Sequence, residues 1–129
     1  MADMEAPVGE LTLRTLAMPA DANAAGDIFG GWLMAQMDLA ASSVASRHAR
    51  GRAVTIAVEG MTFHRPVFVG DELSVYARLV KTGRTSMQVE VEAWARDRHG
   101  DDLNKVTNAA FTFVAVGQDR RPRAVQALV

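Results

Sequence analysis

The residues best suited to chemistry lie in one stretch, 23–32, which reads Asn-Ala-Ala-Gly-Asp-Ile-Phe-Gly-Gly-Trp. Asp27 directly precedes the first turn of a predicted helix, where free backbone N–H groups carry the positive end of the helix dipole. Gly30 and Gly31 leave the backbone open to a ligand. This combination suits acyl transfer, with Asp27 as general base or nucleophile and the two glycine N–H groups as donors to an oxyanion.

A purely structural role explains the same residues. Aspartate is a frequent N-cap, and glycines at a helix start also permit close packing. Motifs this short match by chance often. On the local pattern alone, the N-cap interpretation of Asp27 is therefore favoured over the catalytic one.

The helix that follows Asp27 is predicted to be about 18 residues long, or ~27 Å, and to end near His48, with Gly51 as the stop. Apolar residues occupy nearly every face of it: Trp32, Leu33, Met34, Met37, Leu39, Ala40, Ala41, Val44 and Ala45. A helix that is apolar all round has to be buried on all sides.

The remaining elements are predicted strands, because apolar and polar residues alternate with a period of two. They cover residues 11–17, 53–59, 73–79, 87–96 and 105–116. The predicted fold is α+β, with one curved antiparallel sheet wrapped around the buried central helix. One such sheet cannot cover every side of the helix and leaves two edge strands open. We therefore expect two copies to pair edge to edge, as a dimer or a multiple of dimers.

Composition limits the class of protein. The chain of 129 residues is 49% hydrophobic and has a net charge of −1, which predicts one globular domain over 1–129, with loose termini at 1–9 and 118–129. It also argues against binding to nucleic acid or a membrane surface. The chain has no cysteine and three scattered histidines, so we expect no metal site. Without a signal-peptide pattern, the expected location is the cytoplasm.

Several separated motifs resemble one family, the YciA-type acyl-CoA thioesterases, which are relatives of the brain acyl-CoA hydrolase. The resemblance spans roughly residues 9–116 and includes 13–19, 23–32, 58–63, 65–67, 70–71 and 80–86. It implies a hotdog fold, hydrolysis of acyl-CoA without a cofactor, and a homo-oligomer, commonly a trimer of dimers, whose active sites lie at the dimer interface.

The resemblance also assigns roles to single positions. Asp27 matches the catalytic aspartate, and Asn23 matches an asparagine that lines the same site and orients water or the carbonyl. Ala25 departs from the family, which often has a second asparagine there. The residues that match CoA-binding positions are Arg65, Lys81, Gly83, Arg84, Thr85 and Ser86.

Other interpretations stay open at this point. Arg65 is as well explained by a surface ion pair with Asp71 or Glu72, and basic hairpin tips such as 81–86 are usually just solvated. Glu59 alternates with apolar residues, so an inward-facing structural salt bridge is expected for it. The competing functions are an enoyl- or hydroxyacyl-thioester (de)hydratase, which needs a histidine near the acid, and a non-catalytic module that binds acyl-CoA.

Overall fold

The computed structural model describes residues 5–128, which form one helix of 20 residues and five strands. In chain order the elements are β1 (Glu10–Leu16), the short 3-10 helix η2 (Pro19–Asp21), α1 (Gly30–Ala49), β2 (Ala53–Glu59), β3 (Asp71–Thr82), β4 (Ser86–Asp97) and β5 (Asn104–Ala115). Each predicted strand is present, with ends that differ from the prediction by a few residues at most.

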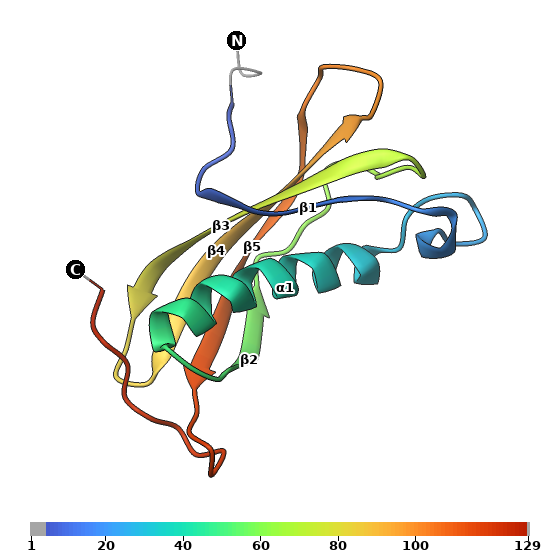
Figure 1. Ribbon diagram of the computed structural model, residues 1–129. Helices are drawn as coiled ribbons and strands as arrows, with labels where there is room; N and C mark the ends of the chain where they lie inside the picture. The colour runs from blue at the N-terminus through green and yellow to red at the C-terminus, as the bar shows by residue number, and fades with distance from the viewer. Residues whose placement is uncertain (1–4, 129) are drawn as a thin grey trace.

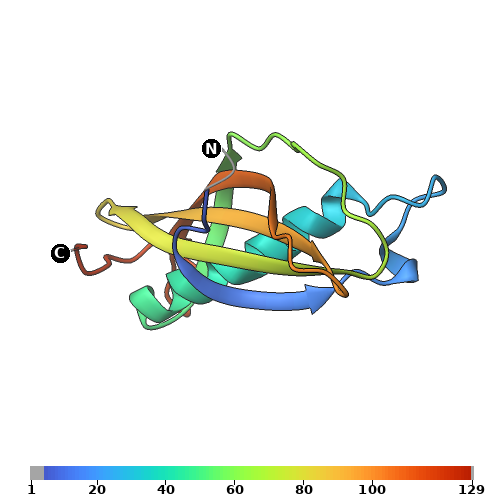
Figure 2. The same ribbon diagram turned by 90° about the horizontal axis from the view of Figure 1, so that it is seen from above.

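The five strands form one antiparallel sheet in the order β1-β3-β4-β5-β2. Figures 1 and 2 show the sheet curving around α1, which lies along its inner side. The predicted α+β architecture, a curved antiparallel sheet around one long helix, is confirmed. Strands β1 and β2 are the two edges, as far apart in the sheet as strands can be.

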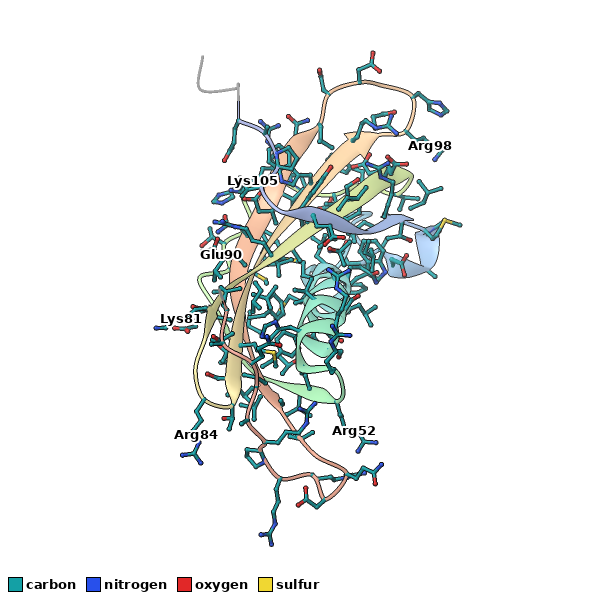
Figure 3. The ribbon with its side chains drawn as sticks, turned by 60° about the vertical axis from the view of Figure 1, so that its left-hand side comes forward. Arg52, Lys81, Arg84, Glu90, Arg98 and Lys105 are labelled. Carbon is teal, nitrogen blue, oxygen red and sulfur yellow. The ribbon has the colours of Figure 1, made fainter. Side chains whose placement is uncertain are left out.

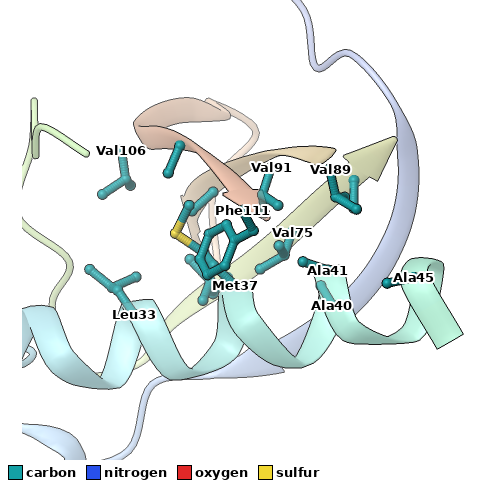
Figure 4. Close-up of a cluster of buried hydrophobic side chains, with 14 of the residues drawn as sticks. Leu33, Met37, Ala40, Ala41, Ala45, Val75, Val89, Val91, Val106 and Phe111 are labelled. Atoms are coloured by element: carbon teal, nitrogen blue, oxygen red, sulfur yellow. The ribbon is translucent and has the colours of Figure 1, made fainter. Parts of the chain in front are cut away.

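The core forms where the inner side of the sheet meets α1, and alternation along the strands supplies its side chains. In β4, the residues Met87, Val89, Val91, Ala93 and Ala95 are all buried, as the period of two predicts. The helix contributes Leu33, Met37, Ala40, Ala41, Ala45 and Ala49, which Figure 4 shows facing the strands in part. The small alanines let the helix approach the sheet closely.

The opposite side of α1 is left largely uncovered by residues 5–128. Met34 and Leu39 are 40% and 59% exposed, although both are large apolar residues. The neighbouring edge strand β2 exposes Val54, Ile56 and Val58 in the same way. One sheet thus covers one side of the apolar helix, and the other side adjoins an exposed apolar strand.

The C-terminal segment differs from the loose tail that the sequence predicts. Arg123 donates from Nη2 to the C=O of Ala49 (2.6 Å) and from Nε to the C=O of Val116 (3.2 Å). The N–H of Val125 donates to the C=O of Arg84 (3.0 Å), and the N–H of Leu128 donates to Oγ1 of Thr82. The segment therefore joins the end of α1 to the β3–β4 hairpin, which composition alone does not reveal.

Candidate active site

The loop that carries Asp27 is closed by hydrogen bonds to Asn23. The N–H of Asn23 donates to the C=O of Asp27 (2.7 Å), and Oδ1 of Asn23 accepts from the N–H groups of Ala25 (2.9 Å) and Asp27 (3.1 Å). Between them, the N–H of Gly26 donates to the C=O of Asn23 (3.0 Å). Gly26 has a φ of +92°, a conformation that favours glycine because other residues clash there.

The N-terminus of α1 has no side-chain cap. The N-cap residue is Phe29, whose C=O accepts from the N–H groups of Trp32 (3.1 Å) and Leu33 (3.3 Å). Of the first four N–H groups of the helix, those of Gly30 and Gly31 have no hydrogen-bond acceptor within residues 5–128. Asp27 does not cap the helix, so the N-cap interpretation of this aspartate is wrong.

Asp27 itself is half-buried, and the backbone around it is fixed by the loop between β2 and β3. It forms an antiparallel bridge with Phe68, and the N–H of the next residue, Ile28, donates to the C=O of Val67 (3.0 Å). In the part of the chain that the structure describes, the carboxylate of Asp27 has no hydrogen-bond donor and no ion-pair partner. An anionic group held on a rigid backbone with free oxygens can accept a proton or attack an electrophile.

Three exposed phenylalanines belong to the segments that hold Asp27 and the start of α1. Phe29, Phe63 and Phe68 are all exposed, whereas Phe111 and Phe113 lie in the core. Phe63 contacts the first turn of α1 at Gly30. Phe63 was not predicted to belong to the site, because nothing in its local sequence indicates contact with a glycine thirty-three positions earlier.

Arg65 lies two residues after Phe63. Within residues 5–128 it forms no ion pair with Asp71 or Glu72, the two partners considered for it. The carboxylate of Asp71 accepts from the N–H of Phe68, and Glu72 pairs with Arg14 and Arg96. Arg65 instead lines a cavity of about 530 Å³. The other lining residues are Glu5, His64, Trp94, Leu103, Asn104 and Lys105.

The predicted CoA-binding hairpin lies far from Asp27 within one chain. The turn at Gly83, Arg84 and Thr85 is at the end of the sheet near the C-terminus of α1, and Figure 1 shows it there, at the lower left. Figure 3 places Arg84 at the same end of the molecule as Arg52, opposite Arg98. Because α1 has 20 residues, its two ends are about 30 Å apart. A single chain therefore brings Asn23, Asp27, Gly30 and Gly31 together but not Lys81, Gly83, Arg84, Thr85 and Ser86.

The inward-facing salt bridge expected for Glu59 is absent among the described residues. Glu59 is exposed at the end of β2, and it forms no salt bridge with any residue between Glu5 and Leu128. A register shift between Thr55 and Ala57 explains the error, since it interrupts the alternation from which the inward direction was inferred.

The described residues also bear on whether the chain binds a metal ion and whether one of its helices could cross a membrane. Residues 5–128 contain no group of three or more histidine, aspartate or glutamate side chains placed to hold a metal ion. Within the same range, no helix combines the length and the apolarity that crossing a membrane requires.

Comparison with known proteins shows what this arrangement is similar to. Residues 25–100, more than half of the chain, match the family model of the thioesterase superfamily. The acyl-CoA thioester hydrolase YciA of Salmonella typhimurium is 54% identical over 120 residues, which cover 91% of this chain and 90% of the relative. The match includes Asp27 and the whole first turn of α1.

Solved structures show the same architecture. A hexameric thioesterase from Yersinia pestis aligns with a TM-score of 0.90 at 49% identity, covering 95% of this chain and 100% of that chain. A hexameric hotdog fold thioesterase from Campylobacter jejuni aligns with a TM-score of 0.85 at 42% identity, covering 92% and 91%. The predicted hotdog fold is confirmed.

Proposed function

Because the chain belongs to the thioesterase superfamily, and within it to the YciA-type acyl-CoA thioester hydrolases, we propose that it hydrolyses acyl-CoA to a free acid and CoA with Asp27 as the reacting carboxylate. One observation carries the choice of residue. Among residues 5–128, the carboxylate of Asp27, two residues before the N-cap of α1, has no partner, and the first two N–H groups of that helix, on Gly30 and Gly31, have none either.

Two routes use these groups. As a general base, Asp27 takes a proton from water while the water oxygen bonds to the thioester carbonyl carbon. The resulting oxyanion accepts from the N–H of Gly30 or Gly31, each donor being worth about 3–4 kcal/mol. When the C–S bond breaks, the CoA thiolate takes up the proton.

In the second route the carboxylate attacks the carbonyl carbon itself and expels the CoA thiolate, which takes a proton from solvent. The mixed anhydride that remains is then hydrolysed by water, which restores Asp27. Both routes consume one water and release one acid and one CoA. The proposal includes no metal or other cofactor, since Asp27 supplies the base or nucleophile and the N–H groups of Gly30 and Gly31 supply the oxyanion donors.

The proposed enzyme is a homo-oligomer with active sites at a dimer interface, assembled as a trimer of dimers. Two observations support this assembly. Met34, Leu39 and β2 expose apolar surface, and solved relatives are described as hexameric thioesterases. Pairing of two copies would also bring the remote β3–β4 hairpin of one chain into the active site of the other. A hairpin that is about one helix length from Asp27 of its own chain can approach Asp27 of a second chain.

For CoA itself, we propose contacts to Arg65 and to the hairpin residues Lys81, Gly83, Arg84, Thr85 and Ser86. The hairpin offers cations, hydroxyl groups and backbone N–H groups, which are the groups that bind phosphate. The cysteine-free composition fits a reducing compartment, and the proposed location is the cytoplasm.

The test is release of free CoA from a panel of acyl-CoAs by the wild type and by Asp27→Asn. We expect the wild type to cleave some of the panel and Asp27→Asn to lose nearly all turnover while still binding CoA. Failure of the wild type to cleave any acyl-CoA, with binding intact, would identify a non-catalytic binding module. Cleavage that survives in Asp27→Asn would retain the thioesterase and remove Asp27 from the mechanism.

A further inference from the structure

Asn23 holds both backbone groups of Asp27. Its own N–H donates to the C=O of Asp27 (2.7 Å), and its side-chain Oδ1 accepts the N–H of Asp27 (3.1 Å). The same Oδ1 accepts the N–H of Ala25 (2.9 Å), and the C=O of Asn23 accepts the N–H of Gly26 (3.0 Å). One residue thus closes the whole loop 23–27 through four hydrogen bonds.

Two of these bonds use the full acceptor capacity of the side-chain oxygen. An amide oxygen has two lone pairs, and both are taken by the N–H groups of Ala25 and Asp27. Oδ1 therefore has no lone pair left for a water or a substrate group. The NH2 group is therefore the part of the Asn23 side chain that would have to orient water or the carbonyl if Asn23 contacts them directly.

A third bond bears on the oxyanion donors. The N–H of Gly31 is among the first N–H groups of α1, which have no acceptor within the helix itself, and the C=O four residues before it is that of Asp27. This C=O instead accepts from the N–H of Asn23 at 2.7 Å, and the N–H of Gly31 has no acceptor in the described chain. The bond that fixes Asp27 thus also engages its carbonyl with Asn23 and not with the helix start.

We propose that Asn23 is a positioning residue, which acts through Oδ1 and its backbone N–H to fix the carboxylate of Asp27 relative to the free N–H groups of Gly30 and Gly31. The inference rests on the proposed function, since Asp27 is taken as the reacting group. Its physical basis is the sensitivity of catalysis to geometry: a shift of about 1 Å costs on the order of 100-fold in rate.

Hydrogen exchange of loop 23–27 tests the clamp without any turnover. Asn23→Ala removes Oδ1, and Asn23→Asp keeps an oxygen at the same position. We expect the amides of Ala25 and Asp27 to exchange at least about 10-fold faster in Asn23→Ala, because each loses its acceptor, and at near wild-type rates in Asn23→Asp. The matched control is Asn108→Ala, since Asn108 is exposed on β5 and its side chain makes no hydrogen bond within 5–128.

Turnover then separates positioning from contact. At about pH 8, where carboxyl groups are ionised, we expect Asn23→Ala to lower kcat about 100-fold with little change in KM. Asn23→Asp should recover at least about a tenth of the wild-type kcat. A side chain that instead touches the substrate through its NH2 group would leave Asn23→Asp as inactive as Asn23→Ala, and that result would overturn the proposal.

The outcome is distinguishable from failure of the proposed function. Unchanged amide exchange in Asn23→Ala would refute the clamp even in an active thioesterase. Faster exchange in Asn23→Ala together with a wild type that cleaves no acyl-CoA would refute the proposed reaction, and with it the role of Asn23 in catalysis, while the clamp itself would stand.

Discussion

The ring of Phe63 lies 3.4 Å from the position that a Cβ atom would occupy on Gly30. This is an ordinary van der Waals distance, so an alanine at position 30 would fit against the ring without displacing it. Gly31 has no atom within 4 Å of the equivalent position. Neither glycine has a positive φ that would require it. Folding therefore places no steric demand for glycine at either position.

The first prediction is that Gly30→Ala and Gly31→Ala each stabilise the protein and reduce its activity. Alanine restricts the unfolded chain, which should raise the free energy of unfolding by about 0.4–1 kcal/mol. The added methyl group would at the same time stand beside the free N–H groups and hinder the oxyanion, lowering kcat/KM about 10-fold or more. Urea unfolding and steady-state kinetics measure the two effects. Unchanged kcat/KM in both variants would mean that these N–H groups do not contact the substrate.

The second prediction concerns Arg84 at the tip of the β3–β4 hairpin. If it binds a phosphate of CoA, Arg84→Ala removes a charge-assisted hydrogen bond worth about 1.5–3 kcal/mol and should raise KM by roughly 10- to 100-fold. The comparison substrate is the same acyl group on pantetheine, which lacks the nucleotide and should show no change. Arg98→Ala, at the other end of the molecule, is the matched control. An equal rise in KM for both substrates would contradict phosphate binding by Arg84.

The third prediction is that Arg123 stabilises the fold although it lies in the C-terminal tail. Arg123→Ala removes the donors to the C=O groups of Ala49 and Val116, at 2.6 and 3.2 Å, and leaves the end of α1 without this partner. We expect a loss of about 1–3 kcal/mol in the free energy of unfolding, measured in urea. The control is Arg121→Ala, since the side chain of Arg121 is exposed and forms no hydrogen bond within the described chain. It should change stability by no more than about 0.5 kcal/mol.

The sequence predicted most of the fold because periodicity reports burial. Alternation in β4 and the apolar faces of α1 both reflect which side chains are removed from water, and the structure agrees with each. It could not predict bonds whose partners lie far away in the chain. Of the two acceptors of Arg123, Ala49 is 74 positions distant, so the C-terminal tail was predicted to be loose.

The candidate site was predicted in part for the same reason. Asp27, Gly30 and Gly31 became candidates because a helix start has chemistry that is visible in local sequence, and the family resemblance then favoured the catalytic role over the N-cap. The role of Asn23 depends on which of its atoms are already bonded, and a sequence pattern contains no such information. Phe63 reaches Gly30 only through the folding of a long loop between β2 and β3. In the proposed dimer, the approach of the hairpin to Asp27 depends on a second chain.

The last prediction concerns which edge of the sheet pairs between copies. Ile56 is 58% exposed in the middle of edge strand β2, and a lysine there opposes strand pairing because its charge would be buried. We expect Ile56→Lys to break the oligomer into smaller species, measured by light scattering at matched concentration, and to abolish turnover because the hairpin of a second chain is lost. Circular dichroism would check that the variant chain remains folded.

The matched variant is Leu11→Lys on β1, the other edge, where Leu11 is 42% exposed. Dissociation of Ile56→Lys alone would support pairing through β2. Dissociation of Leu11→Lys alone would transfer the dimer interface to β1 and place the hairpin differently relative to Asp27. If Ile56→Lys dissociated to monomers and still cleaved acyl-CoA at the wild-type rate, each chain would hold a complete active site, and the proposed contribution of a second chain would be wrong.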